Sequence, residues 1–211
     1  MALREEQIHR YSRQILLPEV GGRGQRRLLA GELQLCGLGS VGVCCALYLA
    51  AAGVGRVWLS DDALVSAGDV GLAGVYQPED IGFSREEIVQ RRLTSLNSDA
   101  VCLVGASPSA RAIYCGAAAA SLEHQSGLRV GVFEHRAIVQ SGCLACAPVL
   151  SDGEGPLDEA LAMIAGSLGA YEALCTLLGH VSPVSDTQLS FEGERMRYQK
   201  QAILCAQQTK R

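Results

Sequence analysis

The pattern of apolar and polar positions in the first third of the chain predicts a strand, a sharp turn, a helix and a second strand. An apolar strand at residues 33–36 runs without a gap into a glycine turn at 37–42. Small and apolar residues then fill a helical stretch at 41–52, and residues 56–60 have the composition of the second strand. A G-x-G-x-x-G spacing between a strand and a helix is typical of a nucleotide-binding Rossmann unit.

The acidic end of the second strand strengthens this interpretation. Asp61 follows the last glycine of the turn by about twenty residues, the distance at which an acid in such folds takes a ribose hydroxyl. The candidate nucleotide-binding residues are therefore Gly37, Gly39, Gly42 and Asp61. A fold keeps such glycines for packing even after it loses its ligand, so the pattern supports the fold more strongly than present nucleotide binding.

The remaining periodicity predicts further strands and helices in alternation. Helices are expected at 7–17, 25–29, 84–96 with Ser84 as N-cap, 109–122 and 157–178, and strands at 100–104, 129–133, 137–140, 188–191 and 196–199. The last two strands predict a C-terminal hairpin. The predicted fold class is α/β: a Rossmann-like, doubly wound, mostly parallel sheet with helices on both faces. We expect one domain over 1–211, with a helical N-terminal arm at 1–30.

Composition and charge exclude several classes of protein. A net charge of −4 and a pI near 5.6 argue against a nucleic-acid partner. The start of the chain lacks the pattern of a secretory signal, and the longest apolar run considered, 41–54, is too short to cross a bilayer, so we expect a cytoplasmic protein without a membrane partner. Most of the nine cysteines are expected to be reduced and buried, namely Cys36, Cys44, Cys45, Cys102 and Cys175.

An ordered set of motifs carries a family likeness. The run Arg10-Tyr11-Ser12-Arg13-Gln14, the glycine turn, residues 52–55, one C-x-x-C and residues 166–174 follow one another nearly from end to end of the chain. In this order they resemble the ThiF/MoeB/HesA family, which is similar to the adenylation domains of ubiquitin-activating enzymes. The resemblance implies binding of ATP and magnesium and adenylation of the C-terminal carboxylate of a small ubiquitin-like sulfur carrier.

The positions that the resemblance assigns to the triphosphate and the metal are mostly replaced. The family motif after the second strand is roughly D-x-D-x-V-x-x-S-N-L-x-R-Q, and the replacements are Ala63, Asp69, Leu72 and Ala73. Arg85 stands for the family lysine, and Ala106 for the magnesium aspartate. We therefore expect ATP or AMP to bind weakly at most and magnesium not to bind. The alternative is an intact ATP site in another register that uses residues such as Arg85 and Asp69.

Arg13 survives in the N-terminal arm. In dimers of the family the matching arginine resembles a finger that reaches the neighbour's triphosphate, where it stabilises transition-state charge in trans. The resemblance thus implies a catalytic role for Arg13 and a dimer, either of two copies or with an active homologue, through residues 41–52, 157–178 and the arm. The alternative is a solvated arginine on a helix surface.

A structural zinc is the third implication of the resemblance. Family members often hold the ion with two C-x-x-C pairs, and Cys143 and Cys146 match the first pair. The second pair is reduced to Cys205, with Gln208 at the position of its partner. Three thiolates with an unknown fourth ligand would form one kind of site. We favour the other interpretation, an emptied site with ordinary thiols.

Three functional hypotheses follow. The first is a catalytically degenerate activating-enzyme subunit that supports an active homologue or binds a small ubiquitin-like carrier. The second is an active ATP-dependent adenylyltransferase that activates the C-terminal carboxylate of a ubiquitin-like sulfur carrier or a peptide. The third is a nucleotide-binding sensor without chemistry.

Overall fold

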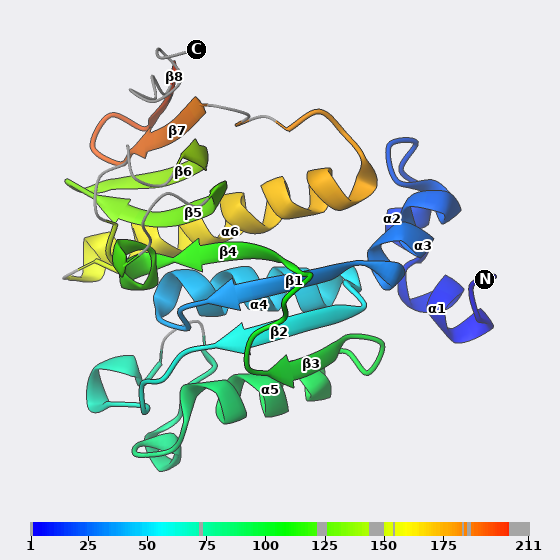
Figure 1. The fold of residues 1–211 in the computed structure, drawn as a ribbon, viewed down its shortest axis with the longest axis horizontal. Helices are drawn as coiled ribbons and strands as arrows, with labels where there is room; N and C mark the ends of the chain where they lie inside the picture. Colours follow the sequence, from blue (N-terminus) through cyan, green and yellow to red (C-terminus); the bar gives the residue numbers. More distant parts are fainter. Residues whose placement is uncertain are drawn as a thin grey trace.

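The fold is built on one eight-stranded sheet with the strand order β3-β2-β1-β4-β5-β6-β7-β8 (Figure 1). The structure is a computed structural model that describes residues 2–71, 74–121, 126–143, 150–153, 155–182, 184 and 187–202. The strands are β1 (Glu32–Cys36), β2 (Arg56–Ser60), β3 (Val101–Val104), β4 (Arg111–Cys115), β5 (Ser126–Phe133), β6 (Arg136–Cys143), β7 (Thr187–Glu192) and β8 (Arg197–Ala202). Strands β1 to β5 pair in parallel, and β5 to β8 pair in antiparallel fashion. The order reverses between β1 and β4, as in doubly wound sheets, and β7 and β8 form the predicted hairpin.

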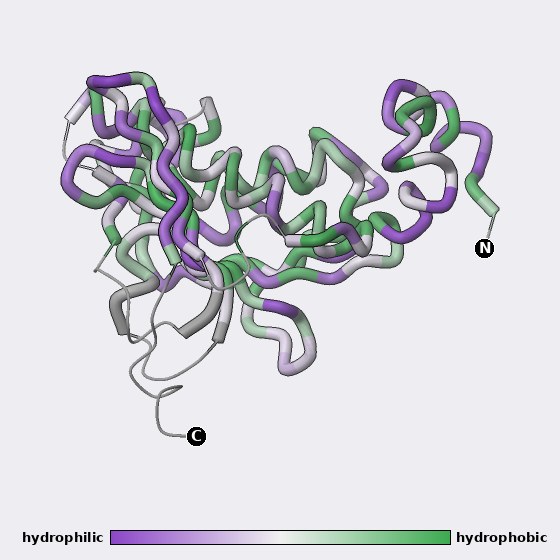
Figure 2. Tube along the Cα trace, turned by 90° about the horizontal axis from the view of Figure 1, so that it is seen from above, coloured by the Kyte–Doolittle hydropathy of each residue, from purple (hydrophilic) through white to green (hydrophobic). Residues whose placement is uncertain are grey.

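Helices and short 3-10 turns connect the strands. The α-helices are α1 (Glu5–Arg10), α2 (Ser12–Ile15), α3 (Gly21–Ala30), α4 (Ser40–Ala52), α5 (Arg85–Leu96) and α6 (Pro156–Leu178). The 3-10 helices are η1 (Ala67–Asp69), η3 (Pro78–Asp80) and η4 (Gly116–Ser121). Helices α1 to α3 lie beyond the amino ends of the parallel strands, and Figure 2 shows that hydrophilic residues are prominent there, whereas apolar residues gather along the central helices.

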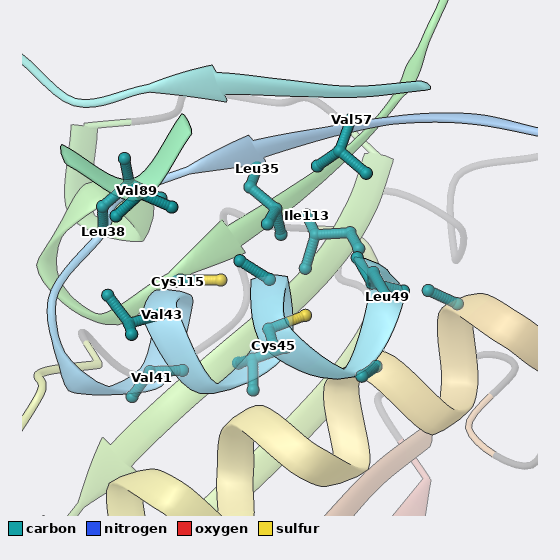
Figure 3. Packing of buried hydrophobic residues seen from close by; sticks show 14 of the residues in the cluster. Leu35, Leu38, Val41, Val43, Cys45, Leu49, Val57, Val89, Ile113 and Cys115 are labelled. Carbon is teal, nitrogen blue, oxygen red and sulfur yellow. The ribbon is translucent and has the colours of Figure 1, made fainter. Parts of the chain in front are cut away.

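Helix α4 forms the centre of the core. It is apolar on all sides because one side faces the sheet and the opposite side packs against α6 (Figure 3). A Cβ atom on Gly166 of α6 would lie 2.4 Å from the Val41 carbonyl oxygen of α4, and one on Gly169 would lie 2.6 Å from Val130 of β5. Both glycines therefore allow α6 to pack closely against its neighbours. Most of α4 is buried, but Tyr48 is 54% exposed, so the part of α4 in a dimer stays a prediction.

The three long helices share one face of the sheet. Helix α4 packs against both α5 and α6, so they form a single layer. On the other face lies the connection 105–110, where the Ser107 N–H donates to Gln34 Oε1 over 3.0 Å. Gln34 alternates along β1 with Leu33 and Leu35, which face the helical layer. The expectation of helices on both faces is corrected for the α-helices among the described residues, because the connection from β3 to β4 is too short for a crossover helix.

The helix predicted at 109–122 is wrong over its described part. Residues Arg111–Cys115 form β4, which pairs with β1 on one side and β5 on the other, and the alanines that follow belong to the 3-10 helix η4. Ile113 and Cys115 are each 1% exposed. Burial in the middle of a parallel sheet therefore outweighs the helix propensity of the alanine-rich sequence.

Tyr11 anchors the N-terminal helices to the body of the protein. It is 1% exposed, and its ring lies where a Cβ atom on Gly53, the left-handed residue that ends α4, would fall. Its hydroxyl accepts a hydrogen bond from Asn97 over 2.9 Å and donates one to Asp99 over 3.3 Å. The contact joins two motifs of the family likeness. Helix α3 begins at Gly21, earlier than the helix predicted at 25–29.

Two further expectations concern α6 and the cysteines. By length and composition alone α6 is able to cross a membrane, so 41–54 is not the longest apolar stretch of the chain. Half of the most apolar 18-residue stretch of α6 is buried inside the fold, as in a core helix. The five cysteines predicted to be reduced are free thiols, and so is Cys115. All of them are buried except Cys36, which is half-buried, so the prediction of burial is wrong for Cys36.

Candidate functional site

A polar cavity of about 480 Å³ lies at the carboxyl ends of β1, β2 and β4. It sits where the strand order reverses, the position at which open α/β sheets bind ligands. Its lining brings together four of the predicted site residues, Gly37, Gly39, Asp61 and Arg85. The other lining residues are Cys36, Ser60, Asp62, Cys115, Ala117, Ala118 and Asp152.

Two contacts hold the glycine turn in place, one with the start of α4 and one with Tyr76. A Cβ atom on Gly42 would lie 1.9 Å from the Gly37 carbonyl oxygen, so only glycine lets α4 start so close to the turn. The buried Tyr76 hydroxyl donates to the Leu38 carbonyl over 2.7 Å. The Leu38 N–H in turn donates to Asp61 Oδ2 over 2.6 Å. The predicted glycines and the predicted acid therefore form one rigid unit at the mouth of the cavity.

Asp61 is positioned as the sequence predicted, at the end of β2. Besides the bond from Leu38, it accepts from the Ala63 N–H over 2.9 Å and faces Arg85 Nη1 at 3.4 Å. Its own N–H donates to Glu86 Oε1 over 2.9 Å. The role of Asp61 toward a ribose stays a prediction.

Arg85 begins α5 directly after Ser84, which is the N-cap as predicted, although the Ser84 side chain makes no capping bond. Arg85 Nη2 donates to Asp69 Oδ1 over 2.6 Å. Burial by itself lowers the pKa of Arg85, but the bond and charge of Asp69, together with the charge of Asp61, outweigh burial and raise this pKa. The positive charge of Arg85 is thus already shared by two carboxylates, which leaves less of it for a phosphate group.

Asp152 is the site residue that sequence reasoning missed. Its Oδ1 atom accepts from the Val41 N–H at the start of α4 over 3.3 Å, and a Cβ atom on Gly39 would lie 2.6 Å from its carboxyl carbon. Burial raises the pKa of Asp152 in spite of the hydrogen bond from Val41 and the nearby charge of Arg85. Asp152 stands in the polar stretch 148–156, which the sequence presents only as a crossing between elements, so no local pattern pointed to it.

The charged residues of the cavity bear on which ligand it can hold. Binding of the adenosine half of a ligand by the glycine turn and Asp61 stays a prediction. Arg85 is paired with two acids, and the Asp152 carboxylate lies at the start of α4. A phosphate group at that helix end would lie beside this carboxylate. In the described part of the chain, no three metal-ligating side chains group closely enough to hold a metal ion.

The position assigned to the magnesium aspartate lies outside the cavity. Ala106 is in the connection 105–110 and is not part of the cavity lining, whereas Ala117 and Ala118, just after β4, do line it. The expected absence of magnesium stays a prediction. Leu72 and Ala73 lie outside the described residues.

Arg13 lies away from the cavity. The side chains of the cysteine pair lie outside the described residues. Arg13 is exposed on α2, beyond the opposite end of the sheet (Figure 1), and has no ion pair or hydrogen bond with the described residues. It cannot reach the cavity of its own chain, so its catalytic role in trans stays a prediction. The zinc prediction falls outside the description: Cys146 and Cys205 are not described, nor is the side chain of Cys143.

Sequence comparisons with known proteins match about half of this chain. The family model described as "ThiF family" matches residues 11–111. The chain is 40% identical over 97 residues to the sulfur carrier protein ThiS adenylyltransferase of Escherichia coli strain K12, a match that covers 46% of this chain and 39% of the relative. It is 41% identical over 102 residues to the adenylyltransferase and sulfurtransferase MOCS3 of Mus musculus, covering 48% of this chain and 22% of the relative. The matched part is therefore well under half of these relatives.

Structural similarity extends further than the sequence match. E. coli MccB superposes with a TM-score of 0.77 at 18% identity, over 93% of this chain and 71% of the other, and PaaA with a TM-score of 0.76 at 18% identity, over 96% and 75%. At this identity the likeness shows the fold alone. The sequence match, by contrast, covers the glycine turn, Asp61 and Arg85 together. Residues 11–111, just under half of the chain, are therefore similar to the ThiF family.

Proposed function

We propose that this chain is an activating-enzyme domain that adenylates the C-terminal carboxylate of a ubiquitin-like sulfur carrier or a peptide at the expense of ATP. The observation that carries the proposal is the single unit formed by the glycine turn and Asp61, within the segment that matches the ThiF family model. The chain is also 40% identical over 97 residues to a sulfur carrier adenylyltransferase. The peptide alternative is supported by the fold of MccB, which has been crystallised with ATP and with MccA.

The reaction would place a polyanion at the start of α4. A carboxylate oxygen of the carrier attacks the α-phosphorus of ATP, an acyl adenylate forms, and pyrophosphate leaves. In this chain the N–H groups at the start of α4 would face the phosphates, and Arg85 and Asp61, whose side chains are 3.4 Å apart, line the same cavity.

The second candidate function is that of a supporting subunit for an active homologue. It is favoured because the described residues of the cavity offer no unpaired positive charge. Arg85 is the one cationic side chain among the described cavity residues, and it is bound to Asp61 and Asp69. A chain with such a cavity would contribute to catalysis through the partner's site. Arg13 is the exposed cation that would do so. Such a dimer would use the N-terminal helices together with the exposed parts of α4 and α6.

Pyrophosphate exchange separates the two candidates. The purified chain is mixed with each candidate carrier, with ATP and magnesium, in the presence and absence of an active ThiF-type homologue. Exchange by the chain alone supports the adenylyltransferase. Exchange that requires the homologue and rises when this chain is added supports the supporting subunit. No effect of the chain in either mixture, over a full set of carriers, refutes both.

The Arg13→Ala variant tests the role in trans. We expect turnover of the mixed complex to fall by about tenfold or more, because a finger arginine stabilises transition-state charge. Arg23→Ala is the matched control: it removes another exposed arginine from the neighbouring helix α3 and should leave turnover unchanged. Equal turnover of the Arg13→Ala complex and the unmodified complex would exclude the finger.

A further inference from the structure

The start of α4 is occupied by carboxylates of the chain itself. In nucleotide-binding folds the N–H groups at this helix end bind the phosphates of the ligand. Here Asp152 Oδ1 accepts from the Val41 N–H over 3.3 Å, and Glu159 Oε2 accepts from the Ser40 hydroxyl over 2.8 Å. Asp152 comes from the segment before α6 and Glu159 from the first turn of α6, far along the chain from the glycine turn.

The Asp152 carboxylate lies in the space next to the glycines. Cβ atoms on Gly39 and Gly116 would lie 2.6 Å and 2.5 Å from its carboxyl carbon, so the group sits between the glycine turn and the end of β4. The same carboxylate lines the cavity opposite Asp61 and Arg85. A phosphate group that approaches the start of α4 would therefore meet a negative charge before it meets the N–H groups.

The backbone around Asp152 holds the carboxylate there. On one side, Ser151 forms a two-way bridge with Val132 of β5, with both N–H to carbonyl distances at 2.9 Å. On the other side, Gly153 has a φ of +95°, and a Cβ atom there would lie 2.5 Å from the Asp158 Cβ atom. Leu150, just before the bridge, is 1% exposed. The placement of Asp152 is thus built into the fold.

On the basis of the nucleotide site proposed above, we propose that Asp152 is the specificity-determining residue of this cavity, an internal anion that competes with nucleotide phosphates for the start of α4. The unmodified chain should therefore bind ATP more weakly than a chain that lacks this carboxylate. Two carboxylates confined near each other repel, and the same holds for a carboxylate and a phosphate. The raised pKa of Asp152, caused first by burial, agrees with a carboxylate that is poorly solvated.

Calorimetric titration with adenosine, AMP and ATP tests the proposal. Asp152→Ala removes both the charge and the bulk, and Asp152→Asn removes the charge alone. We expect both variants to bind ATP more tightly by roughly tenfold or more, with adenosine affinity within about twofold of the unmodified chain. Circular dichroism confirms folding, and Asp152→Ser serves in the same titrations if either variant fails to fold.

Asp62→Asn is the matched control. It removes another carboxylate from the same cavity, but no hydrogen bond joins the Asp62 side chain to the start of α4 among the described residues. Its gain in ATP affinity should be smaller than that of Asp152→Asn. An equal gain would show that only the overall charge of the cavity matters, which overturns the assignment to Asp152.

The remaining outcomes distinguish this inference from the proposed function. ATP affinity that is unchanged in the Asp152 variants, or that rises only as much as adenosine affinity, overturns the role of Asp152 and leaves the adenylyltransferase standing. Tighter ATP binding without pyrophosphate exchange supports the role of Asp152 and counts against the enzyme. If neither the unmodified chain nor any variant binds adenosine, AMP or ATP, both proposals are refuted.

Discussion

Replacing Gly42 by alanine tests whether the glycine turn and α4 are packed as closely as the structure shows. The added Cβ atom would lie 1.9 Å from the Gly37 carbonyl oxygen, whereas ordinary contact begins near 3.4 Å, so the two groups have to separate by about 1.5 Å. That shift moves the backbone beside Leu38, whose N–H binds Asp61 over 2.6 Å and whose carbonyl accepts from the buried Tyr76 hydroxyl.

The expected loss of stability follows from three opposing effects. Overpacking costs about 1–3 kcal/mol, and loss of a hydrogen bond to a charged group adds about 1.5–3 kcal/mol. The better helix propensity of alanine returns about 1 kcal/mol. The free energy of unfolding should therefore fall by about 3 kcal/mol, which lowers the melting temperature by roughly 6–12 °C in a chain of this size.

Urea and thermal unfolding, followed by circular dichroism, measure this change. Gly22→Ala is the matched control, because Gly22 also lies in a helix and its Cβ atom would meet only Arg26 Nη1, at 3.8 Å. The control should unfold at the same midpoint as the unmodified chain or slightly later. The reasoning is refuted if Gly42→Ala unfolds at the unmodified midpoint, or if Gly22→Ala is destabilised to the same extent.

Two further variants test the groups that support the cavity. Tyr76→Phe should lower the free energy of unfolding by about 1–2 kcal/mol in urea unfolding, because the buried Leu38 carbonyl loses the donor that lies 2.7 Å away; no loss would contradict that bond. Asp69→Asn should cost about 3 kcal/mol at pH 7, because it leaves the partly buried Arg85 without its nearest partner. Bonds from Arg85 and Ser66 outweigh burial and lower the pKa of Asp69, so its stabilising contribution is present above the unfolded pKa and is lost as the pH falls through the folded pKa. The difference between Asp69→Asn and the unmodified chain should shrink below about pH 4, and a constant difference would contradict the pair.

Much of the candidate site could be predicted from local sequence. The glycine turn, the acid at the end of β2 and Arg85 at the start of α5 all follow from strand, turn and capping patterns that span a few residues each. Their meeting in one cavity follows from parallel strands, whose carboxyl ends lie at the same edge of a sheet. The pairing of their charges could not be predicted, because Arg85 binds Asp69 across a loop that carries no periodic pattern.

The sequence by itself determined the elements whose signal is local: the strand–turn–helix unit around Gly39, the glycines of α6, and the hairpin of β7 and β8. The tertiary structure alone decided that residues 111–115 form a strand. Pairing with β1 on one side and β5 on the other outweighs the helix propensity of the neighbouring alanines. It alone brought Asp152 to the start of α4, 111 residues away from Val41 in sequence. Contacts of that kind depend on how whole layers pack, and no neighbouring residues encode them.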